Sequence, residues 1–177
     1  GASNTGVGKD ALAANTTGSS SVAVGGLSLL NNTTGSSNVA IGVQALQDNT
    51  TADNNVAVGR DALKVNTTGT ANVAVGANAL DASNADYCTA IGRSVLGANT
   101  TGTQNTAVGS NAMDNNTTGG YNSALGTNAL SSNTTGSENV AIGRQALDDN
   151  TTAIRNVAVG NGALKTNTTG ANNVAIG

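Results

Sequence analysis

Residues 32–51 read NTTGSSNVAIGVQALQDNTT and contain one complete copy of a motif that recurs along the whole chain. The tetrapeptide Val-Ala-Val/Ile-Gly closes each copy, and it ends at Gly25, Gly42, Gly59, Gly76, Gly143, Gly160 and Gly177. Near-copies end at Gly8, Gly92, Gly109 and Gly126. These glycines recur every seventeen residues, except that the interval between Gly76 and Gly92 is one residue shorter. A disordered low-complexity tract has no reason to keep one register over ten units, so the period predicts a folded repeat.

The composition predicts a thin hydrophobic core. Only 1% of the 177 residues are aromatic, namely Tyr87 and Tyr121, and the chain has no Phe, Trp, Pro or His. A close-packed globular core normally contains many bulky side chains, whereas the large apolar residues here are Val, Leu and Ile. We therefore expect backbone hydrogen-bond ladders to supply much of the order in this chain.

The length of the unit decides the fold class. Seventeen residues are too few for two helices and their turns, and they show no apolar stripe with the 3.6-residue helical period. The unit fits one coil of an all-β parallel β-solenoid, or β-roll, of about ten coils, forming a single repeat array over residues 1–177. We expect two short strands per coil, one on Asn-Val-Ala-Val/Ile and one around Ala-Leu, with Asn-Thr-Thr-Gly as a turn. At about 4.8 Å per coil the rod would be about 50 Å long.

The middle residue of the Val-Ala-Val/Ile strand does not vary in ten copies: Ala23, Ala40, Ala57, Ala74, Ala90, Ala107, Ala124, Ala141, Ala158 and Ala175. Because neighbours in a strand face opposite sides, the Val and Ile residues point one way and the alanines point the other way. A strand that is apolar on both faces is usually buried on both. We expect one face to line the coil and the alanine face to pack against sister chains. In the alternative, the alanines line a small coil interior and the Val residues meet another partner.

The segment NTTGSSNVAIGVQALQDNTT resembles the repeats of bacterial and phage tail-fibre-domain surface proteins. More distantly, NVAIG is similar to the head repeats of YadA-type trimeric autotransporter adhesins. The resemblance covers the whole chain. In those families the head is a homotrimer of parallel β-rolls with the Val-Ala-Ile strand facing the trimer axis, so the resemblance implies a homotrimer here. Autotransporter heads commonly use shorter units, which leaves the shape of the coil open.

One coil, residues 77–92, is irregular because it is one residue short and lacks Asn-Thr-Thr-Gly. In it, Cys88 takes the place that Asn38 and Asn55 hold in other coils. We expect Cys88 to be a small buried residue; an interchain disulfide or a reactive thiol is the alternative. A longer period is also present, since residues 39–76 and 140–177 agree at 28 of 38 positions, including several that vary between other coils. The offset between these two segments equals five regular units and the short one, which indicates duplication of a six-coil block.

Two sets of asparagines recur at fixed places in the repeat. The Asn that precedes Val-Ala-Val/Ile is predicted to stack into an amide ladder, with ion binding by its oxygens as the alternative. Nine copies of Asn-Thr-Thr, for example at Asn15, Asn66 and Asn133, are formal glycosylation acceptors. A turn signal explains them without a sugar, and neighbouring acceptors would lie only about 4.8 Å apart. Partial modification of these sites is the alternative.

The sequence contains no recognisable catalytic constellation. Without His, the chain lacks the common general base and a usual transition-metal ligand. Asp148 and Asp149 are adjacent in a turn, where we expect them to be solvated rather than paired for acid–base chemistry. No phosphate-binding loop occurs, and a net charge of −3 without aromatic platforms argues against nucleic acid. We expect no enzymatic activity and no catalytic, cofactor-binding or metal-binding residue.

These observations favour a structural segment of an extracellular or virion fibre or adhesin, which extends rigidly and presents a repetitive surface. The expected partner is the chain itself, as a homotrimer or filament, and beyond it a host-surface receptor or glycan, without membrane insertion of this segment. An ice-binding solenoid with rows of threonine such as Thr16, Thr33 and Thr50 is one alternative, and a glycosylated single-chain filament is another. Neither end carries a capping unit with a polar outer face, so we expect a longer natural protein.

Overall fold

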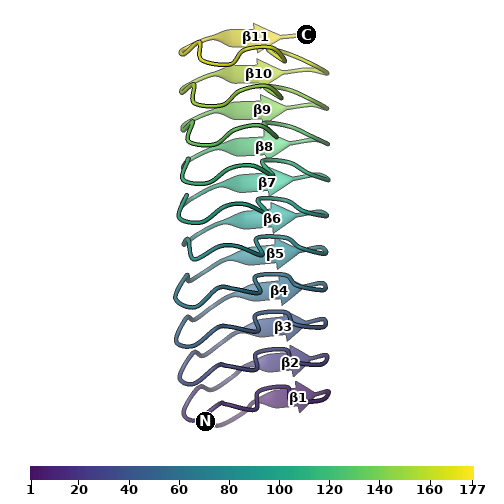
Figure 1. Cartoon of the computed structure of the whole chain (residues 1–177), viewed down its shortest axis with the longest axis vertical. Coiled ribbons are helices and arrows are strands. Elements are labelled where there is room, and N and C mark those ends of the chain that lie inside the picture. The colour runs from purple at the N-terminus through teal and green to yellow at the C-terminus, as the bar shows by residue number, and fades with distance from the viewer.

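The computed structural model describes residues 1–177 and consists of coils stacked along one long axis (Figure 1). Each coil contributes one strand of three residues, and the strands form a single parallel sheet in sequence order. The predicted all-β parallel β-solenoid of about ten coils is confirmed. The eleven strands are β1 (Thr5–Val7), β2 (Val22–Val24), β3 (Val39–Ile41), β4 (Val56–Val58), β5 (Val73–Val75), β6 (Thr89–Ile91), β7 (Thr106–Val108), β8 (Ser123–Leu125), β9 (Val140–Ile142), β10 (Val157–Val159) and β11 (Val174–Ile176).

The register of the sheet places equivalent residues of the repeat directly above one another, and we call each such line a column. Ala57 pairs with Ala74 between β4 and β5. The short interval before β6 leaves this register intact, because Ala74 pairs with Ala90 and Val73 with Thr89. The shortened coil therefore absorbs its missing residue outside the sheet.

Most of the backbone ladder lies outside the strands. Of 113 backbone–backbone hydrogen bonds, only 20 join two strand residues, and the other 93 involve at least one residue outside the strands. Leu46, for example, donates its N–H to the carbonyl of Ala62 at 3.0 Å, and Leu63 donates to Ala79 at 3.0 Å. Each coil is thus bonded to the next around its circumference, so backbone groups supply the order that bulky side chains supply in a globular core.

The second strand predicted around Ala-Leu is wrong, because this segment forms turns. The backbone is left-handed on both sides of the alanine, with φ of 60° at Gln44 and 50° at Leu46. The chain direction therefore changes twice, and the neighbouring side chains of Ala45 and Leu46 are both fully buried. In a strand, one of the two would point outward. A left-handed leucine costs about 1–2 kcal/mol, and complete burial of its side chain offsets this with about 1.5–3 kcal/mol.

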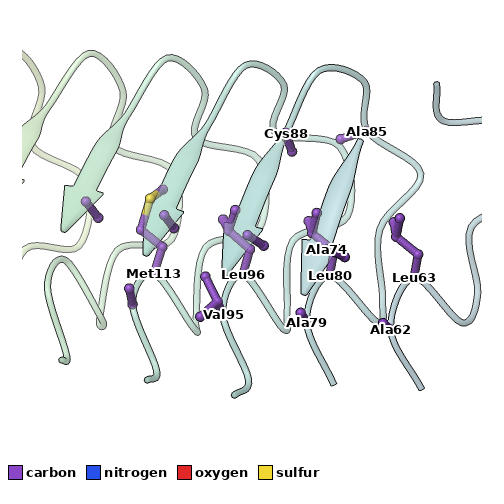
Figure 2. Packing of buried hydrophobic residues seen from close by; sticks show 14 of the residues in the cluster. Ala62, Leu63, Ala74, Ala79, Leu80, Ala85, Cys88, Val95, Leu96 and Met113 are labelled. Atoms are coloured by element: carbon purple, nitrogen blue, oxygen red, sulfur yellow. The ribbon is translucent and has the colours of Figure 1, made fainter. Parts of the chain in front are cut away.

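The core is a cluster of 27 buried residues that runs along the rod. In most coils it contains the strand alanine and the Ala-Leu pair of the facing turn, and Figure 2 shows Ala74, Ala79 and Leu80 in this arrangement. Val95 and Met113 substitute for Ala and Leu in two coils and are also fully buried. The alanines leave room for one large side chain per coil, which explains how a chain so poor in bulky residues still fills its interior.

The irregular coil lacks one residue at the turn where the other coils have Asn-Thr-Thr-Gly. In regular coils the carbonyl of the first Thr accepts backbone N–H groups from the preceding coil, as Thr33 accepts from Thr16 at 2.9 Å. In the short coil the side chain of Asn84 takes over this role. Its Oδ1 accepts the N–H of Thr67 at 2.7 Å and that of Thr68 at 3.4 Å. A side-chain amide thereby replaces the missing backbone group, and the ladder continues through the deletion.

Candidate interaction surface

The fold displays long columns rather than a cavity. It forms no pocket, and no group of three or more His, Cys, Asp or Glu side chains lies together where it could hold a metal ion. The chain contains no helix with the length and hydrophobicity needed to cross a membrane. The candidate surfaces are therefore the columns themselves, which differ in what they contact and in what they leave exposed.

Asp148 and Asp149 do not form a pair of solvated acids. The side chain of Asp148 is buried, with 9% of the residue exposed. It accepts a hydrogen bond from Ser131 Oγ at 2.5 Å and another from Gln145 Nε2 at 3.2 Å. The expectation of solvation is wrong for Asp148, because the turn directs its carboxylate back along the rod toward the preceding coil.

The predicted ladder of the asparagines that precede the strands is confirmed. Oδ1 of Asn38 accepts the backbone N–H of Asn55 at 2.9 Å, and Oδ1 of Asn55 accepts that of Asn72 at 3.0 Å. Nδ2 of Asn38 donates to the carbonyl of Ala52 at 2.8 Å. The amide oxygens therefore bond the next coil, and buried polar groups of this kind are stable only when they are satisfied in this way.

The interpretation of Asn-Thr-Thr as a turn signal misses a second ladder. Nδ2 of Asn133 donates both to Oδ1 of Asn116 at 2.7 Å and to the carbonyl of Gly136 at 2.9 Å. A sugar on this nitrogen would disrupt both bonds and place a bulky group inside the coil. The signal in the sequence is the presence of Asn in nine coils at a place where a turn alone would accept other residues. The fully buried members are Asn32, Asn49, Asn66, Asn99, Asn116, Asn133 and Asn150.

Cys88 lies in the interior, as predicted for a small buried residue. It is 1% exposed, and its N–H donates to Oδ1 of Asn72 at 2.8 Å, so it joins the ladder at the asparagine place. Its thiol lies 3.3 Å from the carbonyl of Gly102, within range for a hydrogen bond from sulfur. Burial raises the pKa of the Cys88 thiol above its ordinary value, which favours the unreactive protonated form.

The threonine rows differ in their exposure. The first Thr of each turn donates its hydroxyl to the next coil, as Thr16 Oγ1 does to Thr33 at 2.8 Å and Thr33 Oγ1 does to Thr50 at 2.9 Å. These donors, which the ice-binding alternative needs at the surface, are used within the ladder. A single exposed row remains, formed by the second threonines and interrupted at the short coil: Thr17, Thr34, Thr51, Thr68, Thr101, Thr118, Thr135, Thr152 and Thr169.

The strand alanines lie inside the coil, so the expectation that they pack against sister chains is wrong. Ala40, Ala57 and Ala107 are 0% exposed within the single chain. The reason is the facing Ala-Leu turn, whose leucine fills the interior and leaves space only for a methyl group on the strand. The part of the alternative interpretation that places the alanines in a small coil interior is confirmed, and the Val and Ile residues of the strands face outward.

Two columns form the outward side of the sheet, and we call them together the outer face. The third residues of the strands form an unbroken apolar column, in which Ile41 and Ile91 are 40% and 41% exposed. The first residues of the strands are also apolar, apart from β1 and three polar residues in β6, β7 and β8. The unbroken column consists of Val7, Val24, Ile41, Val58, Val75, Ile91, Val108, Leu125, Ile142, Val159 and Ile176.

A pair of acids lies in the column that follows Ala-Leu. Asp81 and Asp114 are two coils apart, and Gly97 stands between them without a side chain. A Cβ on Gly97 would lie 2.8 Å from Oδ1 of Asp114 and 3.8 Å from Oδ1 of Asp81, so both carboxylates border the same space. Partial burial raises the pKa of Asp81, and burial followed by the charge of Asp81 raises the pKa of Asp114.

This acid pair should make stability depend on pH. Because both pKa values are higher in the folded state, folding takes up protons, and the free energy of unfolding rises as the pH falls toward the ordinary Asp value of 3.8. We expect the double substitution Asp81→Asn and Asp114→Asn to raise the melting temperature by about 1–3 °C at neutral pH, since solvent screens these half-exposed groups.

The difference in melting temperature between the variant and the parent should vanish near pH 3, where both carboxyls are protonated in either state. Thermal denaturation followed by circular dichroism at both pH values measures it. Asp10→Asn combined with Asp149→Asn removes the same charge elsewhere and serves as the control. An equal gain in the control, or a gain that persists at low pH, would contradict the assignment to this acid pair.

The fold defines the chain as a parallel β-solenoid repeat protein. Comparison with protein-family models, with curated proteins and with solved structures finds no match in any of the three.

Proposed function

We propose that the chain is a structural segment of an extracellular or virion fibre or adhesin. In this role it holds other parts of the assembly at a distance and presents a repetitive surface. The continuous backbone ladder supports the proposal, because each coil is bonded to both neighbours around its circumference and bending must distort many bonds at once. Ten strand intervals of about 4.8 Å give the rod a length of about 48 Å.

The observation that carries the proposal is the unbroken apolar column of the outer face. An exposed apolar strip of this length is typical of an interaction site. A strip about 48 Å long and about 10–13 Å wide would bury on the order of 480–620 Å² per copy, somewhat less than a standard interface, which buries about 800 Å² per partner. No charged residue occurs in either column of the outer face, so contact would desolvate apolar groups rather than unpaired charges.

A sister chain is the partner that fits this strip best, because it offers the same column with the same spacing along its whole length. We infer a homotrimer, in which the outer faces of three rods turn toward a common axis. The resemblance to tail-fibre and autotransporter head repeats supports three copies rather than two. The contact uses the Val and Ile side chains, because the alanines are enclosed within each coil.

Light scattering on the purified chain tests the proposal. We expect a mass about three times the 17.0 kDa of one chain. The double substitution Ile91→Glu and Ile142→Glu should lower the mass to that of a single chain, since it introduces two carboxylates into the strip at residues that are 41% and 39% exposed. Because both side chains are exposed, the dissociated single chain should still fold.

Val43→Glu combined with Val65→Glu is the matched control. These valines are 51% and 39% exposed but lie outside the strands, at places where other coils carry Arg60 or Asp48. The control should keep the mass of the parent protein. A parent mass equal to that of one chain would refute self-association, and equal dissociation of both double variants would show that the outer face is not the contact.

A further inference from the structure

The two aromatic residues of the chain lie at the same place in the repeat. Tyr87 and Tyr121 each stand two residues before a strand, β6 and β8 respectively. They are 63% and 62% exposed. Two coils separate them, so their backbones lie about 9–10 Å apart along the rod. All of the aromatic surface of this protein is therefore concentrated in one short stretch of one edge of the outer face.

Folding alone does not account for these tyrosines. Both adopt left-handed backbone, with φ of 59° and 61°, a conformation that every coil shows at this place and that costs a residue with a side chain about 1–2 kcal/mol. Because their rings are exposed, burial returns little of this energy. Ala71 holds the same place in another coil with φ of 57°, so the position does not require a ring. The exposed rings are free to serve a contact with another molecule.

The column that holds the two rings carries no charge between them, and the charges that follow Tyr121 in it, Glu138 and Arg155, are paired with each other at 3.0 Å. Gln104 lies between them in the same column and is exposed. The adjacent residues of the sheet are Thr89, Thr106 and Ser123, which are the polar residues that interrupt the first column of the outer face. The nearby carboxylate of Asp86 is engaged, because it accepts hydrogen bonds from the backbone and hydroxyl of Thr70 at 2.7 and 3.1 Å.

We propose that Tyr87, Gln104 and Tyr121 bind a neutral, linear β-1,4-linked glycan that lies along the rod. This proposal builds on the proposed adhesin function and names the class of ligand. A tyrosine ring offers a rigid apolar face at small entropic cost, which suits the C–H face of a pyranose. The side-chain amide of Gln104 and the two tyrosine hydroxyls can both donate to and accept from sugar hydroxyls, and none of these three residues belongs to the two columns that face the sister chains.

The spacing of the rings favours this glycan. Two coils correspond to about 9–10 Å, which is close to the length of two linked pyranose rings. In a β-1,4-linked chain, alternate sugars present the same face, so two tyrosines at this distance would stack on the first and third sugars of a segment. Gln104 lies where it would meet the sugar between them.

Anionic ligands fit this surface less well. The one cation of this column, Arg155, is paired with Glu138 at 3.0 Å, and the net charge of the chain is −3, so a phosphate backbone would find no free cation beside the rings. Tyrosine pairs also occur in protein interfaces, and a protein ligand would give a different outcome in the test below.

Titration with cellohexaose, followed by tyrosine fluorescence and calorimetry, tests the proposal. Because the chain has no Trp and these are its only two tyrosines, its aromatic emission reports directly on this surface. We expect saturable binding of cellohexaose and a loss of affinity of about tenfold or more in Tyr87→Ala and in Tyr121→Ala. Maltohexaose, whose α-linkages do not present alternate rings in line, should bind at least about tenfold more weakly.

Folding of the variants is secured by Ala71, which shows that this place accepts alanine. Val43→Ala removes a comparably exposed apolar side chain elsewhere and should keep full affinity. Absence of cellohexaose binding at millimolar concentration, undiminished binding by the tyrosine variants, or equal binding of maltohexaose would each overturn the proposal. The mass measured by light scattering does not depend on any of these three binding results. Failure of the glycan proposal can therefore be distinguished from failure of the proposed fibre function.

Discussion

Replacing Gly59 with alanine is expected to lower the free energy of unfolding by about 3–5 kcal/mol. Gly59 follows β4 and has a φ of 137°, a region that residues with side chains rarely adopt. A Cβ at this place would also lie 2.5 Å from the carbonyl oxygen of Gly76 and 2.6 Å from its carbon, far inside contact distance. The atom it meets belongs to the backbone of the next coil, which the ladder holds in place on both sides, so the clash cannot be relieved by a rotamer change.

The matched control is Gly26→Ala, since a Cβ on Gly26 has no atom within 4 Å and Ala77 stands at the same place in another coil. Chemical denaturation followed by far-UV circular dichroism should give a much lower midpoint for Gly59→Ala and an almost unchanged midpoint for Gly26→Ala. Similar midpoints for the two variants would show that the stack can widen locally, and that the glycine column does not set the spacing of the coils.

The same column explains why the fold class could be predicted from the sequence. A glycine at a constant interval, flanked by Val-Ala-Val/Ile and a run of turn residues, fixes the length of the coil and the place of one strand. The deletion in residues 77–92 could also be located, since its Asn-Thr-Thr turn is visibly incomplete. What compensates for it, the side chain of Asn84, depends on a geometry that spacing does not contain.

The Ala-Leu segment shows where sequence reasoning stops. Leucine has no intrinsic preference for left-handed backbone, so nothing local predicts a φ of 50° at Leu46 or Leu63. Packing decides, because only the double change of direction brings both apolar neighbours inside. The absence of charge at both places indicates that both side chains are buried, but the strand segment Val-Ala-Val/Ile shares this absence, so it does not distinguish a turn from a strand.

The choice between the two faces of the strand also needed the structure. Strand alternation separates the alanines from the Val and Ile residues, but it does not say which side is enclosed. The leucine of the facing turn settles this, because a large side chain on one wall of a narrow coil requires a small one on the other. The candidate contact surface is therefore the outer face and not the alanine column, although the apolar character of both faces could be predicted from the sequence.

Asn116→Asp is expected to have the second large effect, a loss of about 3–5 kcal/mol at neutral pH. Nδ2 of Asn116 donates to Oδ1 of Asn99 at 2.8 Å and to the carbonyl of Gly119 at 2.9 Å, and the residue is 0% exposed. The substitution keeps the shape of the side chain but replaces this double donor with an oxygen. The new carboxylate oxygen would then face two other acceptors, Oδ1 of Asn99 and the carbonyl oxygen of Gly119. An ionised carboxylate would also be enclosed without a cation.

Protonation should restore part of the loss, because a neutral carboxyl can donate one of the two hydrogen bonds. The folded state of the variant therefore takes up a proton that the unfolded state does not hold at neutral pH, and its unfolding free energy should rise toward that of the parent as the pH falls. Denaturant titrations at neutral pH and near pH 4 measure this recovery. A deficit that is the same at both pH values would mean that steric rather than electrostatic changes are responsible.

Two controls separate the ladder from general effects of charge and size. Asn115→Asp adds the same charge to the exposed neighbouring residue, at a place where Asp149 stands in another coil, and should change stability by less than about 0.5 kcal/mol. Asn116→Ser imitates Ser83, which holds this place in the short coil and accepts from Asn99 at 3.3 Å. We expect it to lose about 1–2 kcal/mol without any dependence on pH, since it breaks the donor pair but buries no charge. If Asn116→Asp were no worse than Asn116→Ser at neutral pH, the buried amide column would be a spacer rather than a chain of obligatory hydrogen bonds.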